Sequence, residues 1–198
     1  MDKKSTYAVI LETAYQMFAE YGFEKTSMAM IAKQLDISKP ALYYHFPSKE
    51  SIVDMLFEEL CESIEFHKFF TRSEYTKENL EEKLIKDGLY MIMEQKTDPH
   101  YSRIMKQYQA LGYRNPKYAE RLVRILDQYA YGFDELLRLG NPPEAKAIQN
   151  TRILGQLLAM TVDSIDNFAS YGLDYAYEEI WRSTVQAIVN GVRDGGSM

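Results

Sequence analysis

Hydroxyl and ammonium side chains recur where short helices are predicted to begin between residues 26 and 50. Thr26 or Ser27 suits the N-cap of one helix, Lys39 stands at the start of the next, and Lys49 at the start of a third. Hydroxyl groups, free backbone amides at a helix start and ammonium groups all donate to phosphate oxygens. The spacing therefore favours contact with a DNA backbone. The alternatives are N-capping alone for the serine and solvation alone for the lysines.

Two short helices joined by a tight turn must position these side chains. Apolar residues at helical spacing predict helices over about 7–21, 27–35 and 38–46, with Gly22 ending the first and Asp36 in the turn. Ser38 is the expected N-cap of the third helix. The expected small core comprises Ile10, Ala14, Phe18, Ile31, Ala32, Leu35, Ile37, Leu42 and Phe46. Such a helix–turn–helix unit presents one helix to the major groove of DNA.

The third helix ends in an aromatic group. Tyr43 suits a phosphate contact through its hydroxyl, and His45 suits the same contact or a capping role. Tyr44 fits core packing and DNA contact equally well. These residues extend the candidate DNA surface along the helix.

The net charge of −6 is unusual for a DNA-binding protein, but the charge is unevenly distributed. Residues 1–50 carry six basic and six acidic residues, whereas residues 51–198 carry 17 basic and 23 acidic ones. A neutral head on an acidic body binds DNA through a few placed lysines. Non-specific affinity should therefore be modest and salt-sensitive.

Composition and motifs argue against several other classes of protein. No run of about 18 apolar residues and no apolar leader is found, and Cys61 is the single cysteine, so we expect a cytoplasmic protein without a membrane partner. The three histidines are scattered and form no metal-ligand spacing with Cys61. No glycine-rich phosphate loop or Gly-x-Ser-x-Gly motif occurs. We expect no metal, no cofactor, no catalytic residue and no enzyme activity.

The rest of the chain also has helical spacing. A fourth helix is expected over about 48–66, capped by Ser48 after Pro47, and others over about 76–95, 100–111, 116–139, 143–171 and 175–193. Breaks are expected at Thr97-Asp98-Pro99, Gly112 to Pro116, Gly140-Asn141-Pro142-Pro143 and Gly172. Period-2 alternation is absent over any useful length. The chain is therefore predicted to be all-α, with about nine helices.

The N-terminal 50 residues resemble the TetR-type bacterial transcriptional regulators, most specifically in Leu-Tyr-Tyr-His-Phe-Pro-Ser-Lys-Glu. The resemblance is carried by Ile10, Ala14, Phe18, Gly22, Phe23, Thr26, Ile31, Ala32, Ser38, Lys39, Leu42, Tyr43, Tyr44, His45, Phe46, Lys49 and Glu50. It implies a three-helix DNA-binding domain over residues 1–47 and a helical effector and dimerisation domain over residues 48–198.

Several positions depart from the family pattern. Asp36 replaces a frequent turn glycine, and aspartate tolerates a left-handed backbone. Met28 and Ala29 stand at second-helix positions expected to face DNA. Pro40 and Ala41 stand where a recognition helix meets base edges and offer apolar contacts without bidentate hydrogen bonds. Selectivity should therefore depend on apolar contacts, DNA shape and dimer spacing.

The resemblance implies a homodimer through the last two long helices and an effector pocket among the middle helices. The expected dimer residues are Leu157, Ile165, Phe168, Trp181, Thr184 and Ile188, for which intrachain core packing is the alternative. A small apolar or amphipathic effector is expected at residues rich in tyrosine and methionine, for which a core with solvated tyrosine tips is the alternative. The expected pocket residues are Tyr90, Met93, Met105, Tyr108, Tyr129, Phe133 and Met160.

The sequence therefore predicts a dimeric repressor that an effector releases from a palindromic operator in double-stranded DNA. One alternative is a DNA-binding protein of the same build that acts through a protein partner. Another is a helical enzyme or scaffold whose helix–turn–helix no longer binds DNA.

Overall fold

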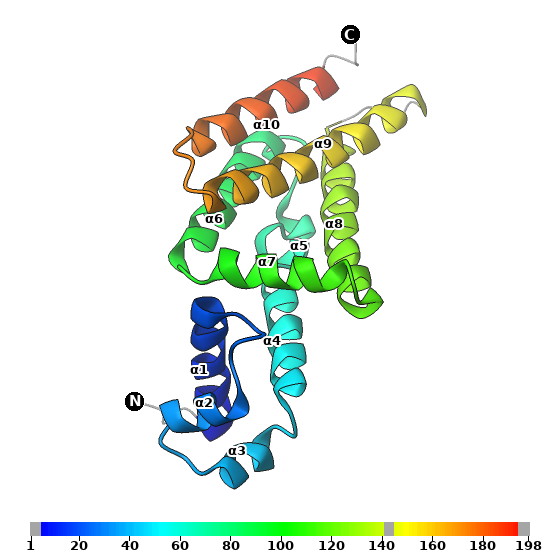
Figure 1. Cartoon of the computed structure of the whole chain (residues 1–198). Helices are drawn as coiled ribbons and strands as arrows, with labels where there is room; N and C mark the ends of the chain where they lie inside the picture. The colour runs from blue at the N-terminus through cyan, green and yellow to red at the C-terminus, as the bar shows by residue number, and fades with distance from the viewer. Residues whose placement is uncertain (1–4, 141–144, 194–198) are drawn as a thin grey trace. The chain divides into compact units, whose positions relative to one another are not determined.

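The structure, a computed structural model, describes residues 5–140 and 145–193 and is all-helical over these residues (Figure 1). The predicted all-α class is confirmed. The helices are α1 (Thr6–Tyr21), α2 (Met28–Gln34), α3 (Lys39–His45), α4 (Lys49–Ser63), α5 (Phe66–Phe69), the 3-10 helix η1 (Arg72–Glu74), α6 (Leu80–Thr97), α7 (Tyr101–Gly112), α8 (Pro116–Leu137), α9 (Ala145–Ser170) and α10 (Tyr177–Arg193). The expected breaks before α7, α8 and α10 are present, whereas Asn141-Pro142-Pro143 lies outside the described residues.

The predicted fourth helix is shorter than expected and is followed by a separate helix, α5. The Ser63 hydroxyl donates to the carbonyl of Leu60 at 2.8 Å in the last turn of α4, and Glu65 is extended. Phe66 and Phe70 then pack face to face at the two ends of α5, with ring centroids 4.8 Å apart. Packing of these two aromatic rings stabilises a chain that leaves α4 after Ser63. The helical periodicity did not predict this break.

The chain forms two compact units, the first comprising residues 5–63 and 99–119. This unit holds α1 to α4 and α7, so it is larger than the 1–47 head expected from the sequence. Tyr108 of α7 explains the difference, because its buried ring packs 4.8 Å from Phe57 and its hydroxyl donates to the carbonyl of Val53 at 2.8 Å. Burial raises the pKa of Tyr108.

Local capping positions the short helices as the sequence predicted. Ser27 and Ser38 accept the amides of Met30 and Ala41, at 3.3 and 3.2 Å. Ser48 and Ser51 cap the start of α4 reciprocally, because each side chain accepts the other residue's amide. Asp36 has φ 52°, so the left-handed turn between α2 and α3 forms without glycine.

The core of the first unit contains most of the residues predicted for it. Ile10, Ala14, Phe18, Ile31, Ala32, Leu42 and Phe46 are buried, whereas Leu35 and Ile37 are half-buried. Gly22 has φ 88°, a conformation that favours glycine, and its amide donates to Phe18 O at 2.9 Å. Thr26 is buried and bonds the carbonyl of Gly22 at 2.9 Å, so Ser27 alone caps α2.

The second unit comprises residues 64–98, 120–140 and 145–193 and contains α5, η1, α6, most of α8, α9 and α10. Its centre is a set of aromatic rings. The ring centroid of Phe133 lies 5.0 Å from that of Phe70 and 6.0 Å from that of Trp181. The ring centroids of Phe66 and Tyr129 are 5.4 Å apart. Offset and edge-to-face rings at these separations stabilise a core beyond the area they bury.

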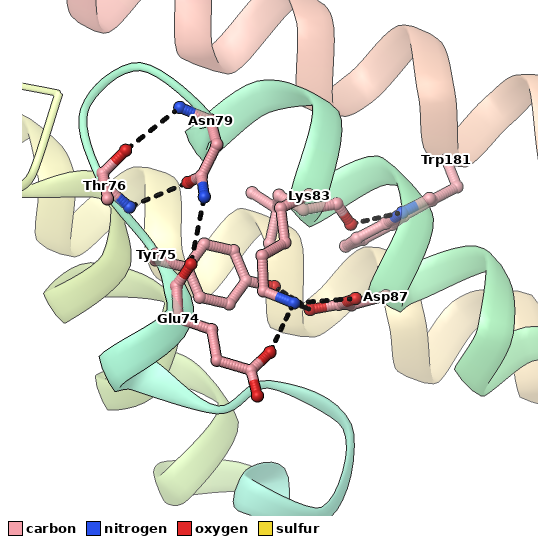
Figure 2. Close-up of polar contacts among 8 residues, drawn as sticks. Glu74, Tyr75, Thr76, Asn79, Lys83, Asp87 and Trp181 are labelled. Atoms are coloured by element: carbon pink, nitrogen blue, oxygen red, sulfur yellow. Dashed lines mark hydrogen bonds and ion pairs between the residues drawn. The ribbon is translucent and has the colours of Figure 1, made fainter.

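Helix α10 packs against α6 and α9, and its contact with α6 depends on Gly88. A Cβ atom at residue 88 would lie 2.2 Å from the indole of Trp181. The Trp181 Nε1–H group is shared between the carbonyls of Leu84 and Ile85, at 3.3 Å each. Glycine therefore lets the buried indole lie directly on the α6 backbone (Figure 2).

A polar network fixes the segment before α6, and Figure 2 shows its members. Thr76 and Asn79 cap each other, with the Thr76 amide donating to Asn79 Oδ1 at 2.7 Å, which delays the helix from the expected residue 76 to Leu80. The Tyr75 hydroxyl donates to Asp87 at 2.6 Å, and burial together with this carboxylate raises the tyrosine pKa. Lys83 bridges Glu74 at 2.8 Å and Asp87 at 3.1 Å.

Candidate nucleic-acid interface

The starts of α2, α3 and α4 surround one hollow on the surface of the first unit. It has a volume of about 430 Å³ and is lined by Ser27, Met28, Ala29, Lys39, Tyr43, Pro47, Ser48, Lys49 and Glu50. Four predicted DNA contacts, Ser27, Lys39, Tyr43 and Lys49, are therefore brought together from three helices. The hollow is thus lined by residues that carry hydroxyl and ammonium groups, Ser27, Lys39, Tyr43 and Lys49, and such donors suit a phosphate.

The remaining predicted contacts lie on the outer side of α3. Pro40 and Ala41 are exposed in its first turn, as apolar base contacts require. Tyr44 is 86% exposed, so it is available to a ligand and not part of the core. His45 is half-buried, with its ring edge-on to Tyr44 at 5.3 Å.

The two apolar residues at the start of α2 differ in exposure. Met28 is 7% exposed and packs mainly in the core, although it also lines the hollow, whereas Ala29 is exposed. Of the pair expected to face DNA, Ala29 therefore presents the larger surface.

Lys49 is held by a contact that the sequence did not reveal. Its ammonium donates to the carbonyl of Phe23 at 2.7 Å, and the side chain is half-buried. An ammonium has three donors, so two remain for other acceptors. The phosphate role predicted for Lys49 is geometrically open, but the side chain is also fixed by its own protein.

The seven predicted effector residues are divided between the two units. Met105 and Tyr108 are buried in the first unit, and the other five belong to the second. In the second unit Tyr129 and Phe133 lie in the aromatic core, whereas Tyr90, Met93 and Met160 are more than half exposed. The Tyr129 hydroxyl donates to the carbonyl of Ile64 at 3.0 Å.

The six predicted dimer residues divide in the same way. Trp181, Ile165 and Ile188 are buried within the chain, so the alternative of intrachain packing holds for them. Leu157 and Phe168 are 46% and 42% exposed, and Thr184 is half-buried. Helical periodicity predicted apolar residues on both faces of each helix, but it did not show which face packs into the core of the chain.

Further exposed apolar side chains lie on α9 and α10 beside these. Ile153 and Met160 of α9 are 64% and 66% exposed, and Ile180 of α10 is 39% exposed. Sequence reasoning assigned Met160 to the effector pocket. These exposed apolar side chains make α9 and α10 the candidate interaction surface of the second unit.

The residues of the candidate interface match a described family of proteins. The family model "Bacterial regulatory proteins, tetR family" matches residues 10–56. A nucleoid occlusion factor SlmA of Aliivibrio fischeri is 29% identical over 181 residues, which cover 87% of this chain and 90% of that protein. The A-factor receptor protein of Streptomyces griseus is 33% identical over 63 residues, 32% of this chain and 23% of the receptor.

A solved structure extends the similarity to the whole chain. The fatty acid degradation regulator FadR from Bacillus halodurans superposes with a TM-score of 0.65 at 23% identity, over 98% of this chain and 99% of that one. The two chains share a fold. In the described part of this chain, no helix is both long and apolar enough to cross a membrane.

Proposed function

Because the chain belongs to the tetR family of bacterial regulatory proteins, we propose that it is a homodimeric repressor that an effector releases from a palindromic operator. The observation that carries DNA binding is the hollow shared by the starts of α2, α3 and α4. Ser27, Lys39, Tyr43 and Lys49 hold a backbone phosphate there, and Pro40, Ala41, Tyr44 and His45 lie toward the groove. Phosphate contacts fix the register, and the exposed face of α3 meets the bases.

The dimer forms through the exposed apolar face of α9 and α10. One helix–turn–helix head reads too little DNA for specificity, and two heads related by a two-fold axis read a palindrome. Leu157 and Met160 stand on the exposed face of α9. Replacing both by glutamate should give a monomer in sedimentation analysis, whereas Tyr131→Glu, at an exposed tyrosine of α8, should stay dimeric.

The effector binds in the aromatic core of the second unit, with Tyr129 and Phe133 as lining residues. Apolar rings with one hydroxyl suit a small apolar or amphipathic molecule. Binding there selects a conformer in which the two heads no longer match the operator spacing, which is a population shift. Cytoplasmic location and the absence of catalysis are part of this proposal.

A DNA-binding assay with the sequence upstream of the gene tests the proposal. The variant Tyr43→Ala plus Lys49→Ala should lose one charged phosphate contact per head, which lowers DNA affinity about eightfold at 0.1 M salt. It should also lose one tyrosine hydrogen bond per head, which lowers DNA affinity about fivefold. The expected loss is about 40-fold per head, with a salt slope reduced by about 0.9 per head.

The matched control is Tyr131→Ala plus Lys86→Ala, which removes an exposed tyrosine and an exposed lysine from the second unit. It should bind like the wild type. Unchanged affinity and salt slope in the Tyr43 and Lys49 variant would refute the assigned contacts. A wild-type protein that binds no duplex at low salt would instead favour the helical enzyme or scaffold.

A second candidate function is a DNA-bound protein that acts through a protein partner. The relative that is similar over most of the chain is named as a nucleoid occlusion factor, a name that refers to no small-molecule effector, and this favours the second candidate. The two candidates can be separated by measuring DNA binding in the presence of substrates and products of enzymes encoded beside the gene. Release of the duplex by one of them supports the effector, whereas a duplex retained with all of them favours the protein partner.

A further inference from the structure

Gln107 of α7 joins two backbone groups at the end of α1 through one amide. The Phe23 amide donates to Gln107 Oε1 at 2.7 Å, and Gln107 Nε2 donates to the carbonyl of Phe18 at 2.9 Å. Nε2 also lies 3.4 Å from the Arg103 carbonyl in its own helix. Phe18 is near the C-terminus of α1 and Phe23 follows the left-handed Gly22, so the amide fixes the exit of the chain from α1.

The Phe23 side chain is fixed as well as its backbone. Its ring lies edge-on to Phe18 at 5.1 Å and tilted on Tyr108 at 4.9 Å. Tyr108 follows Gln107 in α7 and bonds the carbonyl of Val53 in α4 at 2.8 Å. Residues 107 and 108 therefore hold Phe23 from the same helix and tie it to the helix that carries Lys49.

The carbonyl of Phe23 is the acceptor that holds the Lys49 ammonium at 2.7 Å. A lysine side chain has four rotatable carbons and loses much rotamer freedom when it binds a phosphate. The bond to Phe23 removes part of that freedom before DNA arrives and leaves two N–H donors. Lys49 lines the hollow with Lys39 and Tyr43, so the contact to Phe23 fixes one of the two lysines of this surface.

We propose that Gln107 is a positioning residue for DNA binding, which holds the Phe23 peptide so that its carbonyl preorganises Lys49 at the phosphate hollow. This inference rests on the proposed DNA-binding function. It gives α7, a helix without a side chain at the hollow, a direct effect on the affinity for the DNA backbone. Preorganisation raises affinity by lowering the ordering cost of binding.

The test measures the affinity of full-length protein for a labelled 36-base-pair duplex of arbitrary sequence between 50 and 200 mM KCl. Gln107→Met keeps the length of the side chain and removes all three of its hydrogen bonds, including those to Phe18 and Phe23. Lys49→Met should weaken binding about eightfold per head at 0.1 M salt and lower the salt slope by about 0.9 per head. Gln107→Met should weaken binding at least threefold and move the slope toward the Lys49→Met value.

The double variant and the control decide the interpretation. Gln107→Met should add nothing to Lys49→Met, because both act through one ammonium. Gln109→Met, at an exposed glutamine two residues further along α7, should bind like the wild type. Gln107→Asn keeps the amide but withdraws it by one methylene, and serves as the second variant if Gln107→Met does not fold.

Three results would overturn the positioning role. They are a wild-type salt slope in the Gln107 variant, losses that add fully to Lys49→Met, and a Gln107 variant that binds DNA more tightly because the ammonium is released. If the Gln107 substitution only destabilises the fold, the melting temperature falls while the salt slope keeps its wild-type value, which is the first of these results. Absence of salt-dependent DNA binding by the wild type would refute the proposed function itself, and so is distinguishable from them.

Discussion

Replacing Gly88 with alanine tests the packing of α10 on α6. A Cβ atom there would lie 2.2 Å from Cε2 and Nε1 of Trp181, whereas ordinary contact begins at 3.4 Å. The indole must therefore retreat by about 1.2 Å. Its Nε1–H group already donates over 3.3 Å to Leu84 and Ile85, so the retreat breaks both hydrogen bonds inside a fully buried site.

The magnitude follows from three contributions to the free energy of unfolding. Overpacking costs about 1–3 kcal/mol, and a buried indole N–H without an acceptor costs about 1–3 kcal/mol. Alanine in place of glycine inside a helix returns about 1 kcal/mol. The expected net loss for Gly88→Ala is about 1–5 kcal/mol.

Urea unfolding followed by tryptophan fluorescence measures this loss directly, because Trp181 is the single tryptophan of the chain. Protein concentration is held fixed, since a dimer makes stability concentration-dependent. The control is Gly191→Ala in α10, where no atom lies within 4 Å of the added Cβ, and it should leave stability unchanged or raise it by up to about 1 kcal/mol. A Gly88→Ala protein with wild-type stability and unshifted emission would refute the packing described for Trp181.

Three further predictions concern the first unit. Burial raises the pKa of Asp54, but the hydrogen bonds from Lys117 and Tyr118 outweigh it and lower the folded-state pKa, so Asp54→Asn should lower stability at pH 7. The stabilisation by the wild-type carboxylate is full above the unfolded-state pKa of about 4 and is lost as the pH falls through the lowered folded-state pKa, so the difference between variant and wild type should shrink on acidification. Thermal melts from about pH 7 down to about pH 2 check this, and a difference that stays constant over that range would contradict it. Asp36→Gly should raise the melting temperature slightly and Asp36→Val should lower it, because φ 52° is costly for a β-branched residue. Ser38→Ala should cost about 1 kcal/mol by removing the N-cap of α3, measured by urea unfolding, and no change would show that the cap contributes nothing.

Much of the helix–turn–helix was predictable because its signals are local. Ser27, Ser38 and Ser48 each bond an amide three residues away, and Asp36 takes the left-handed conformation that its side chain tolerates. Helical periodicity also predicted the core of this region, because all the predicted core residues except Leu35 and Ile37 are buried. These features depend on neighbours in the chain, which the sequence displays directly.

The bodies of the longer helices were predicted, but not which apolar face each one buries. Trp181 and Leu157 both fit a dimer surface by spacing, yet Trp181 is fully buried against Gly88 and Leu157 is exposed. Tyr129 and Met160 were expected to share a pocket, yet one is buried and the other exposed. The choice depends on which helices pack together, and periodicity does not contain that information.

The sequence by itself determined the helix starts of the helix–turn–helix, the tight turn and the set of side chains suited to phosphate. Only the tertiary structure gathered Ser27, Lys39, Tyr43 and Lys49 around one hollow. Only it joined Gln107 to Phe23, 84 residues apart, and through Phe23 to Lys49. Capping and turn formation are decided within about four residues, whereas such contacts form only when burial of distant apolar surfaces has brought the helices together.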